Sequence, residues 1–151
     1  AERQLSELVK GLDPKRFQVH VVTFYDGGGL RPEIEGLDHV KVHSLRKKSR
    51  WHILRPLIRL FAIVRSVRPE VLHGYMGNAN ELCLVLGALF RRRVVWGLRM
   101  SDRDLKFYDW LTRFTLHTGA WLSKFPDLII VNSFAGRRDH KACGFKSKEM
   151  Y

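Results

Sequence analysis

Three short apolar runs constrain the fold of this chain most, because each ends in polar and small residues and is followed by a helical pattern. They lie in Pro69–Asn80 (PEVLHGYMGNAN), Arg93–Asp102 (RVVWGLRMSD) and Asp127–Gly136 (DLIIVNSFAG). Repeated strand–polar tip–helix units are typical of a parallel sheet, in which each helix returns the chain to the same edge. The loops after the strands then open into one crevice. We therefore expect the chemistry at these three tips.

The rest of the sequence continues this alternation of strands and helices. Apolar patterns typical of strands lie at Phe17–Phe24, Asp38–Leu45, Glu70–His73, Val94–Leu98 and Leu128–Val131. Apolar residues at helical spacing predict helices at Ala1–Leu12, Arg55–Val67, Asn78–Phe90, Asp104–Phe125 and Ala135–Ala142. The order predicts an α/β fold with a Rossmann-like, doubly wound parallel sheet in a single domain over residues 1–151.

The two ends of the sequence indicate a piece of a longer protein. The chain begins at Ala1 inside a helical pattern, whereas a doubly wound domain opens with a strand and a Gly-rich turn. It ends at Tyr151, where a further strand would follow. We expect a fragment whose first strand is missing.

The basic residues are concentrated in residues 41–68, here called the basic segment. The net charge of the chain is +12, and the basic segment holds nine Lys or Arg and no Asp or Glu. A solvated face is the ordinary explanation of such a run, but so many cations favour an anionic partner. The neighbouring Trp51, Ile53 and Leu54 favour a membrane surface. The residues expected there are Lys47, Lys48, Arg50, Trp51, Arg55 and Arg59.

The helix within the basic segment has two predicted sides. Its apolar stripe, which we expect to face the core, consists of Leu54, Leu57, Leu60, Phe61, Val64 and Val67. Arg55 and Arg59 fall on the opposite side.

No apolar run reaches the roughly 18–20 residues of a membrane span, and no signal peptide is visible. Cys83 and Cys143 lack the spacing of metal ligands. We expect reduced thiols, no metal site, and a cytoplasmic protein, peripheral at the inner face of the membrane if the basic segment binds lipid.

The first tip offers His73, Tyr75 and Asn78. His73 is either a satisfied histidine at the end of a buried strand or a polar group on the crevice floor. Tyr75 and Asn78 follow in a loop position that often binds ligands, although Asn78 is also suited to cap the next helix, with Glu81 three residues on.

The second and third tips add further candidates. Arg99 follows an apolar run, and its guanidinium suits a phosphate or a pair of sugar hydroxyls; the alternative is a surface ion pair with a nearby aspartate. Ser101 either joins it or caps the long helix. Asn132 and Ser133 end the last strand, as ligand contacts or as turn and cap residues. His140 is expected to face solvent or a domain that is missing from this fragment.

Five segments follow one another in a specific order: AERQLSELVKGL, FQVHVVTF, PEVLHGYMGNAN, VVWGLRMSD and DLIIVNSFAGRRDHKACGF. Their order and spacing resemble the amino-terminal domain of family 4 glycosyltransferases, over nearly the whole chain. In that family two Rossmann-like domains face each other in a GT-B fold, so the resemblance implies that this chain is one half of such a fold.

The resemblance implies a retaining glycosyltransferase of polysaccharide biosynthesis, which moves a sugar from a nucleotide-sugar to a glycan or polyprenyl-linked acceptor without a required metal or other cofactor. In the family this domain binds the acceptor, and a second domain, absent from these residues, binds the nucleotide-sugar. We therefore expect this chain alone to be inactive. Many members carry His-x-His after the fourth strand. Here the run is His73-Gly74-Tyr75, so the second histidine's role does not carry over to Tyr75, and His73 is the catalytic candidate.

Two other classes of function fit parts of the sequence. The pI of about 10.2 is compatible with a non-catalytic module that binds nucleic acid or a membrane surface, but no helix-turn-helix, RNP or zinc signature accompanies it, and no nucleic-acid partner is expected. A dinucleotide-binding oxidoreductase would need a G-x-G-x-x-G turn leading into a helix. The glycines at Gly27–Gly29 lack that spacing.

Overall fold

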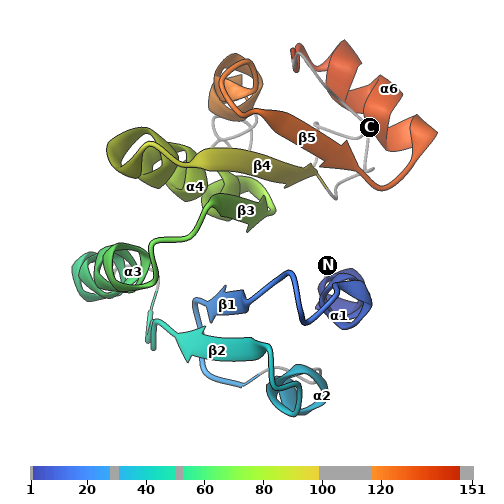
Figure 1. Cartoon of the computed structure of the whole chain (residues 1–151). Helices are drawn as coiled ribbons and strands as arrows, with labels where there is room; N and C mark the ends of the chain where they lie inside the picture. Colours follow the sequence, from blue (N-terminus) through green and yellow to red (C-terminus); the bar gives the residue numbers. More distant parts are fainter. Residues whose placement is uncertain (1, 28–30, 50–52, 99–116, 147–151) are drawn as a thin grey trace. The chain divides into compact units, whose positions relative to one another are not determined.

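The computed structural model describes residues 2–27, 31–49, 53–98 and 117–146 of the chain (Figure 1). The chain divides into two compact units, Ala1–Val67 and Arg68–Tyr151. Each unit contains a parallel sheet, with strand order β1-β2 in the first and β3-β4-β5 in the second. The prediction of an α/β fold built on parallel strands is therefore confirmed.

The first unit is built on β1 (Val19–Thr23) and β2 (Val40–Ser44), which pair in parallel with Val21 opposite Val42. Helices α1 (Glu2–Gly11) and α2 (Arg31–Glu35) supply the apolar side chains that cover one face of these strands. The resulting core consists of Val9, Val21, Ile34 and Val40. Side chains point alternately to the two faces of a strand. The residues that alternate with these core valines therefore project from the opposite face of the sheet.

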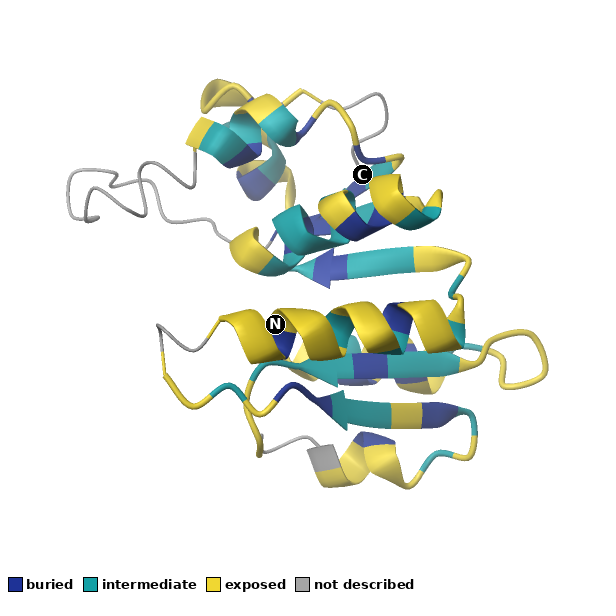
Figure 2. Cartoon of the chain, turned by 90° about the vertical axis from the view of Figure 1, so that its left-hand side faces the viewer, coloured by how far each residue is buried: buried dark blue, intermediate teal, exposed yellow. Residues whose placement is uncertain are grey.

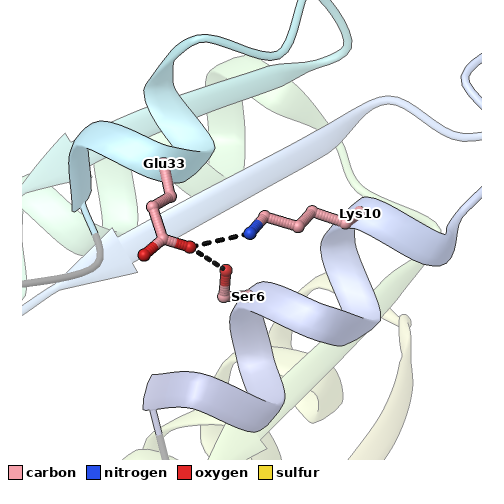
Figure 3. Close-up of polar contacts among 3 residues, drawn as sticks. All are labelled: Ser6, Lys10 and Glu33. Carbon is pink, nitrogen blue, oxygen red and sulfur yellow. Dashed lines mark hydrogen bonds and ion pairs between the residues drawn. The ribbon is translucent and has the colours of Figure 1, made fainter.

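A polar contact joins the two helices of this unit beside the core (Figure 3). Lys10 Nζ lies 2.7 Å from Glu33 Oε2, and the hydroxyl of the buried Ser6 donates to the same oxygen over 3.4 Å. The hydrogen bond to Lys10 lowers the pKa of Glu33, and its counterpart raises the pKa of Lys10. Both charged side chains are partly exposed, so this pair orients α2 more than it stabilises the unit.

Two histidines meet on the opposite face of the β1-β2 sheet. His20 Nδ1 lies 2.9 Å from His43 Nε2, and the rings are nearly parallel, with centroids 5.2 Å apart and an interplanar angle of 9°. A nitrogen–nitrogen distance this short is too close for face-to-face stacking. The rings therefore meet edge to edge, and the N–H of one ring donates to the bare nitrogen of the other. Burial, His43 and Lys41 together lower the pKa of His20.

Helix α3 (Leu54–Val67) is amphipathic, but its buried face differs from the predicted stripe. Pro56 and Val64 are its buried residues. Leu54 is 72% exposed, and Leu57 and Phe61 are exposed as well, so placing these three in the core was wrong. Figure 2 shows the outer side of this helix as mostly exposed. The basic segment thus presents apolar and cationic side chains together.

The second unit is a three-stranded parallel sheet of β3 (Val71–Tyr75), β4 (Arg93–Leu98) and β5 (Leu128–Val131), with β4 in the middle. Helix α4 (Gly77–Phe90) packs on β3 and β4, residues 117–122 are helical, and α6 (Phe134–Ala142) follows β5. The core of this unit is Val94, Trp96, Leu98, Ile129, Val131 and Phe145. The core residues of β4 and β5 alternate along their strands and so share one face of the sheet, and Phe145 packs against them.

One helix is observed beyond the predicted elements, and one predicted helix is described only in part. Helix α2 was not predicted, because the glycines before it indicated only a loop. Of the helix predicted at Asp104–Phe125, residues 117–122 are helical, and residues 104–116 lie outside the described part.

The chain after this helix is held by Ser123. Its hydroxyl donates to Ala120 O over 2.7 Å and accepts the backbone N–H of Lys146 at the same distance.

Candidate functional site

The carboxyl ends of β3, β4 and β5 lie along one edge of the second sheet. In the parallel register, Tyr75 at the end of β3 pairs with Gly97 of β4, and Leu98 at the end of β4 pairs with Val131 at the end of β5. Strand ends that are aligned this closely carry their following loops to the same side. Tyr75 and the pair Asn132–Ser133 are therefore brought to one edge, as the sequence predicted.

A single carbonyl oxygen joins the first two tips. The oxygen of Gly97 accepts the backbone N–H of Met76 and the side-chain Nδ2 of Asn80, each over 3.2 Å. The backbone N–H of Asn80 in turn donates to Met76 O over 3.0 Å. The turn between β3 and α4 is thus fixed both to its own helix and to the neighbouring strand.

Met76 occupies a backbone conformation that residues with a side chain rarely adopt. Its φ of 75° and ψ of 160° lie in a region that is nearly restricted to glycine. Such strain costs about 1–3 kcal/mol and persists only where surrounding contacts hold it, often beside ligands. The contacts of Met76 and Asn80 with Gly97 supply that restraint at the end of β3.

His73 and Tyr75 project from the face of the sheet that α4 does not cover. They alternate with Gly74, and Gly74 faces α4 so closely that an added Cβ would lie 2.6 Å from Asn80 Oδ1. The rings of His73 and Tyr75 contact one another, with centroids 4.5 Å apart. His73 does not end its strand as predicted, because β3 continues for two more residues.

Helix α4 begins differently from the prediction. Asn78 is exposed in the first turn of the helix and does not cap it. Met76 stands at the cap position, and its side chain makes no capping hydrogen bond. The role of Asn78 as a cap is therefore wrong, and its amide faces solvent beside the tip of β3.

The third tip is organised by a helix cap. Ser133 Oγ accepts the backbone N–H of Gly136 over 3.0 Å at the start of α6, as expected for a cap residue. Asn132 and Ser133 are both exposed. His140 does not face solvent as predicted: it is 7% exposed, its Nδ1–H donates to Gly136 O over 2.8 Å, and its ring meets Phe145 edge-on.

Several predicted residues are placed elsewhere or lie outside the described residues. Arg99 and Ser101 lie outside them, as do Arg50 and Trp51 of the basic segment. Arg55 and Arg59 are exposed on α3, Lys48 is exposed before it, and Lys47 lies 5.7 Å from the Phe24 ring centroid. Among the residues with described positions, no three His, Cys, Asp or Glu side chains gather to hold a metal ion, and no helix is long and apolar enough to cross a membrane.

Sequence reasoning missed Asn80. The signal that could have found it is a polar residue inside a helix that is apolar almost all round, because such a helix is expected to be buried. Cys83 in the same helix is buried enough to raise the pKa of its thiol to about 11, so it is a protonated side chain of the core at neutral pH.

Comparison with known proteins agrees with this geometry. Solved structures of HepE from Anabaena, in complexes with UDP-glucose and with UDP and glucose, each superpose with a TM-score of 0.71 at 19% identity. The UDP-glucose complex matches 99% of this chain and 39% of the HepE chain. The chain therefore spans about two fifths of HepE, and it has the Rossmann-like fold of a GT-B half. No curated protein matches the sequence.

The sequence also matches a family model along its whole length. The model for Glycosyltransferase Family 4 covers residues 1–151. This match confirms the resemblance that the order of the strand tips indicated. The chain belongs to glycosyltransferase family 4.

Proposed function

We propose that this chain is the acceptor-binding half of a retaining glycosyltransferase, which moves a sugar from a nucleotide-sugar to a glycan or polyprenyl-linked acceptor in polysaccharide biosynthesis. The observation that carries the proposal is the shared edge at which Tyr75 ends β3 and Ser133 follows β5, the two parallel strands that flank β4. Family membership and the likeness to HepE, whose structure holds UDP-glucose, support it. The donor binds a part of the protein outside these residues, so the chain alone is inactive.

The polar side chains at this edge suit the recognition of sugar hydroxyls. The exposed Ser133 hydroxyl and the exposed amides of Asn78 and Asn132 each donate and accept. The Tyr75 hydroxyl can do the same but is buried, so it reaches a sugar only if the edge opens around it. Arg99 and Ser101, which follow β4 in the sequence, are assigned to the leaving phosphate or to a pair of hydroxyls. His73 is the proposed catalytic group. Catalysis then depends on positioning and on stabilising the charge of the leaving phosphate.

The test uses the full-length protein with UDP-glucose and other nucleotide-sugars as donors. Arg99→Ala should lower kcat/KM about a hundredfold or more, because a charge-assisted bidentate contact is lost. Arg138→Ala, which removes an exposed arginine of α6, should leave activity unchanged. Product anomers identified by NMR test retention. An unchanged turnover in Arg99→Ala would refute its role, and no transfer from any nucleotide-sugar would refute the proposed function.

We further propose that the basic segment binds an anionic membrane surface and brings a lipid-linked acceptor to the enzyme. Leu54 and Ile58, which lie one helical turn apart on α3, are 72% and 60% exposed. Arg55 and Arg59, next to them in the sequence, are exposed too. Apolar side chains flanked by cations, without an acidic residue among residues 41–68, are typical of a helix that lies in a lipid interface.

The membrane proposal is tested by sedimentation with vesicles. Binding should be strong to phosphatidylglycerol vesicles and weak to phosphatidylcholine vesicles, and it should fall with salt. Each cation near the surface contributes about 1 kcal/mol, so the double change Arg55→Glu and Arg59→Glu should weaken binding more than tenfold. Arg138→Glu is the control outside the segment. Equal binding by both variants, or a preference for duplex DNA over vesicles, would contradict the proposal.

A further inference from the structure

The strongest unexplained feature of the second unit is Asn80. It is 2% exposed and lies in the first turns of α4, a helix that is otherwise rich in apolar residues. Its Nδ2 donates to Gly97 O over 3.2 Å. Within the described residues, its Oδ1 is buried without a hydrogen-bond partner. An unpaired buried acceptor destabilises a fold, so the amide is not explained by stability alone.

The amide lies where three parts of the edge converge. On one side it approaches Gly74: an added Cβ there would lie 2.6 Å from Asn80 Oδ1 and 2.7 Å from Asn80 Cα. On another side it shares the Gly97 oxygen with the backbone N–H of Met76. The same residue therefore contacts the end of β3, the strained turn after it and the end of β4.

We infer that Asn80 is a positioning residue, which holds the tip of β3 against the tip of β4 and thereby sets where Tyr75 stands at the acceptor edge. It does not touch substrate. Met76 keeps its glycine-like conformation because its N–H and its carbonyl oxygen are both bonded, to Gly97 and to Asn80. The Asn80 side chain adds the bond that ties the first turn of α4 to the end of β4. Without it, the turn is held only by the two backbone bonds of Met76 and relaxes more easily.

The consequence for catalysis rests on the proposed function. A displacement of about 1 Å in a group that positions a substrate can lower the rate a hundredfold. Tyr75 directly precedes the strained residue, so relaxation of the turn changes the direction of its side chain. Because the donor binds elsewhere, the KM for nucleotide-sugar should not change.

The test compares Asn80→Leu, which keeps a similar volume without the donor, with Asn80→Ala as a second variant in case the first does not fold. The control is Ser123→Ala, which removes another buried polar side chain, bonded to backbone groups of Ala120 and Lys146 and not to the turn after β3. In the full-length protein, the Asn80 variants should lower kcat about tenfold or more at an unchanged KM for the donor. Amide exchange at Met76 should also become about tenfold faster. Ser123→Ala should change neither quantity.

Each outcome decides the inference. Unchanged exchange at Met76 in both Asn80 variants would overturn it, and so would faster exchange with an unchanged kcat per folded molecule. If the unaltered protein transfers no sugar, the proposed function fails, and exchange at Met76 alone still decides whether Asn80 holds the two tips together.

Discussion

The replacement of Gly74 by alanine tests the packing beneath the candidate site most directly. An added Cβ would lie 2.6 Å from Asn80 Oδ1, 2.7 Å from Asn80 Cα and 2.9 Å from Ala79 O. Two of these atoms belong to the backbone of α4 and cannot rotate away. The start of the helix must therefore move from the strand, which also stretches the bond between Asn80 and Gly97.

The size of the effect follows from these contacts. Overpacking of this kind costs about 1–3 kcal/mol, and a lost hydrogen bond that leaves buried groups unpaired costs a further 1–3 kcal/mol or so. The lower entropy of unfolded alanine offsets about 0.5–1 kcal/mol. We expect Gly74→Ala to reduce the free energy of unfolding by about 2–4 kcal/mol, a shift of about 1–2 M in the urea midpoint.

A matched control lies three residues further on. Gly77, the first residue of α4, has no atom within 4 Å of an added Cβ, so Gly77→Ala should be neutral or stabilise by up to about 1 kcal/mol. Urea unfolding followed by tryptophan fluorescence measures both, because the buried Trp96 lies in this unit. Equal midpoints for the two variants would refute the close approach of α4 to β3.

Two further predictions concern titratable groups. Burial raises the pKa of the Cys83 thiol to about 11, whereas Cys143 is exposed. Iodoacetamide at pH 8 should therefore label Cys143 alone in the folded protein, and Cys83 should react only after denaturation. Rapid labelling of both thiols in the folded protein would contradict this. The pKa of His20 is lowered from 6.5 by burial and by His43, so the unfolded chain takes up a proton more readily than the folded one, and stability should decline as the pH falls below about 6.5. His20→Gln should show a smaller loss of melting temperature between pH 7.5 and pH 5 than the unaltered protein, and an equal loss in both would count against a depressed pKa.

The strands were predicted from the sequence because their apolar runs are bounded by clear signals. Leu128–Val131, between Asp127 and Asn132, was placed correctly at both ends. The end of β3 was missed by two residues, because Gly74 and Tyr75 extend the strand only by pairing with Trp96 and Gly97 of β4. Such pairing is a tertiary contact that a local pattern does not contain.

The candidate site was predicted less completely for a related reason. Composition and spacing placed Tyr75 and Ser133 at strand tips, and parallel topology then brought them to one edge. The roles of Asn78 and Asn80 could not be separated in this way, since both are asparagines near the start of one helix. Their difference is burial, which depends on how closely α4 approaches Gly74. His140 was misplaced likewise, because Phe145 covers it only in the folded unit.

The hydrogen-bond acceptor that joins the ends of β3 and β4 is the main-chain oxygen of Gly97, which no side-chain replacement can delete. A saturation mutagenesis screen would therefore detect only one of the two partners in the hydrogen bond between Asn80 and Gly97. Substitutions at Asn80, whose side chain is the hydrogen-bond donor, would be poorly tolerated. No codon change can remove the backbone oxygen of Gly97 that accepts this hydrogen bond. Replacing the peptide bond after Gly97 by an ester, which makes the Gly97 carbonyl a weaker hydrogen-bond acceptor, would test the contribution of this oxygen.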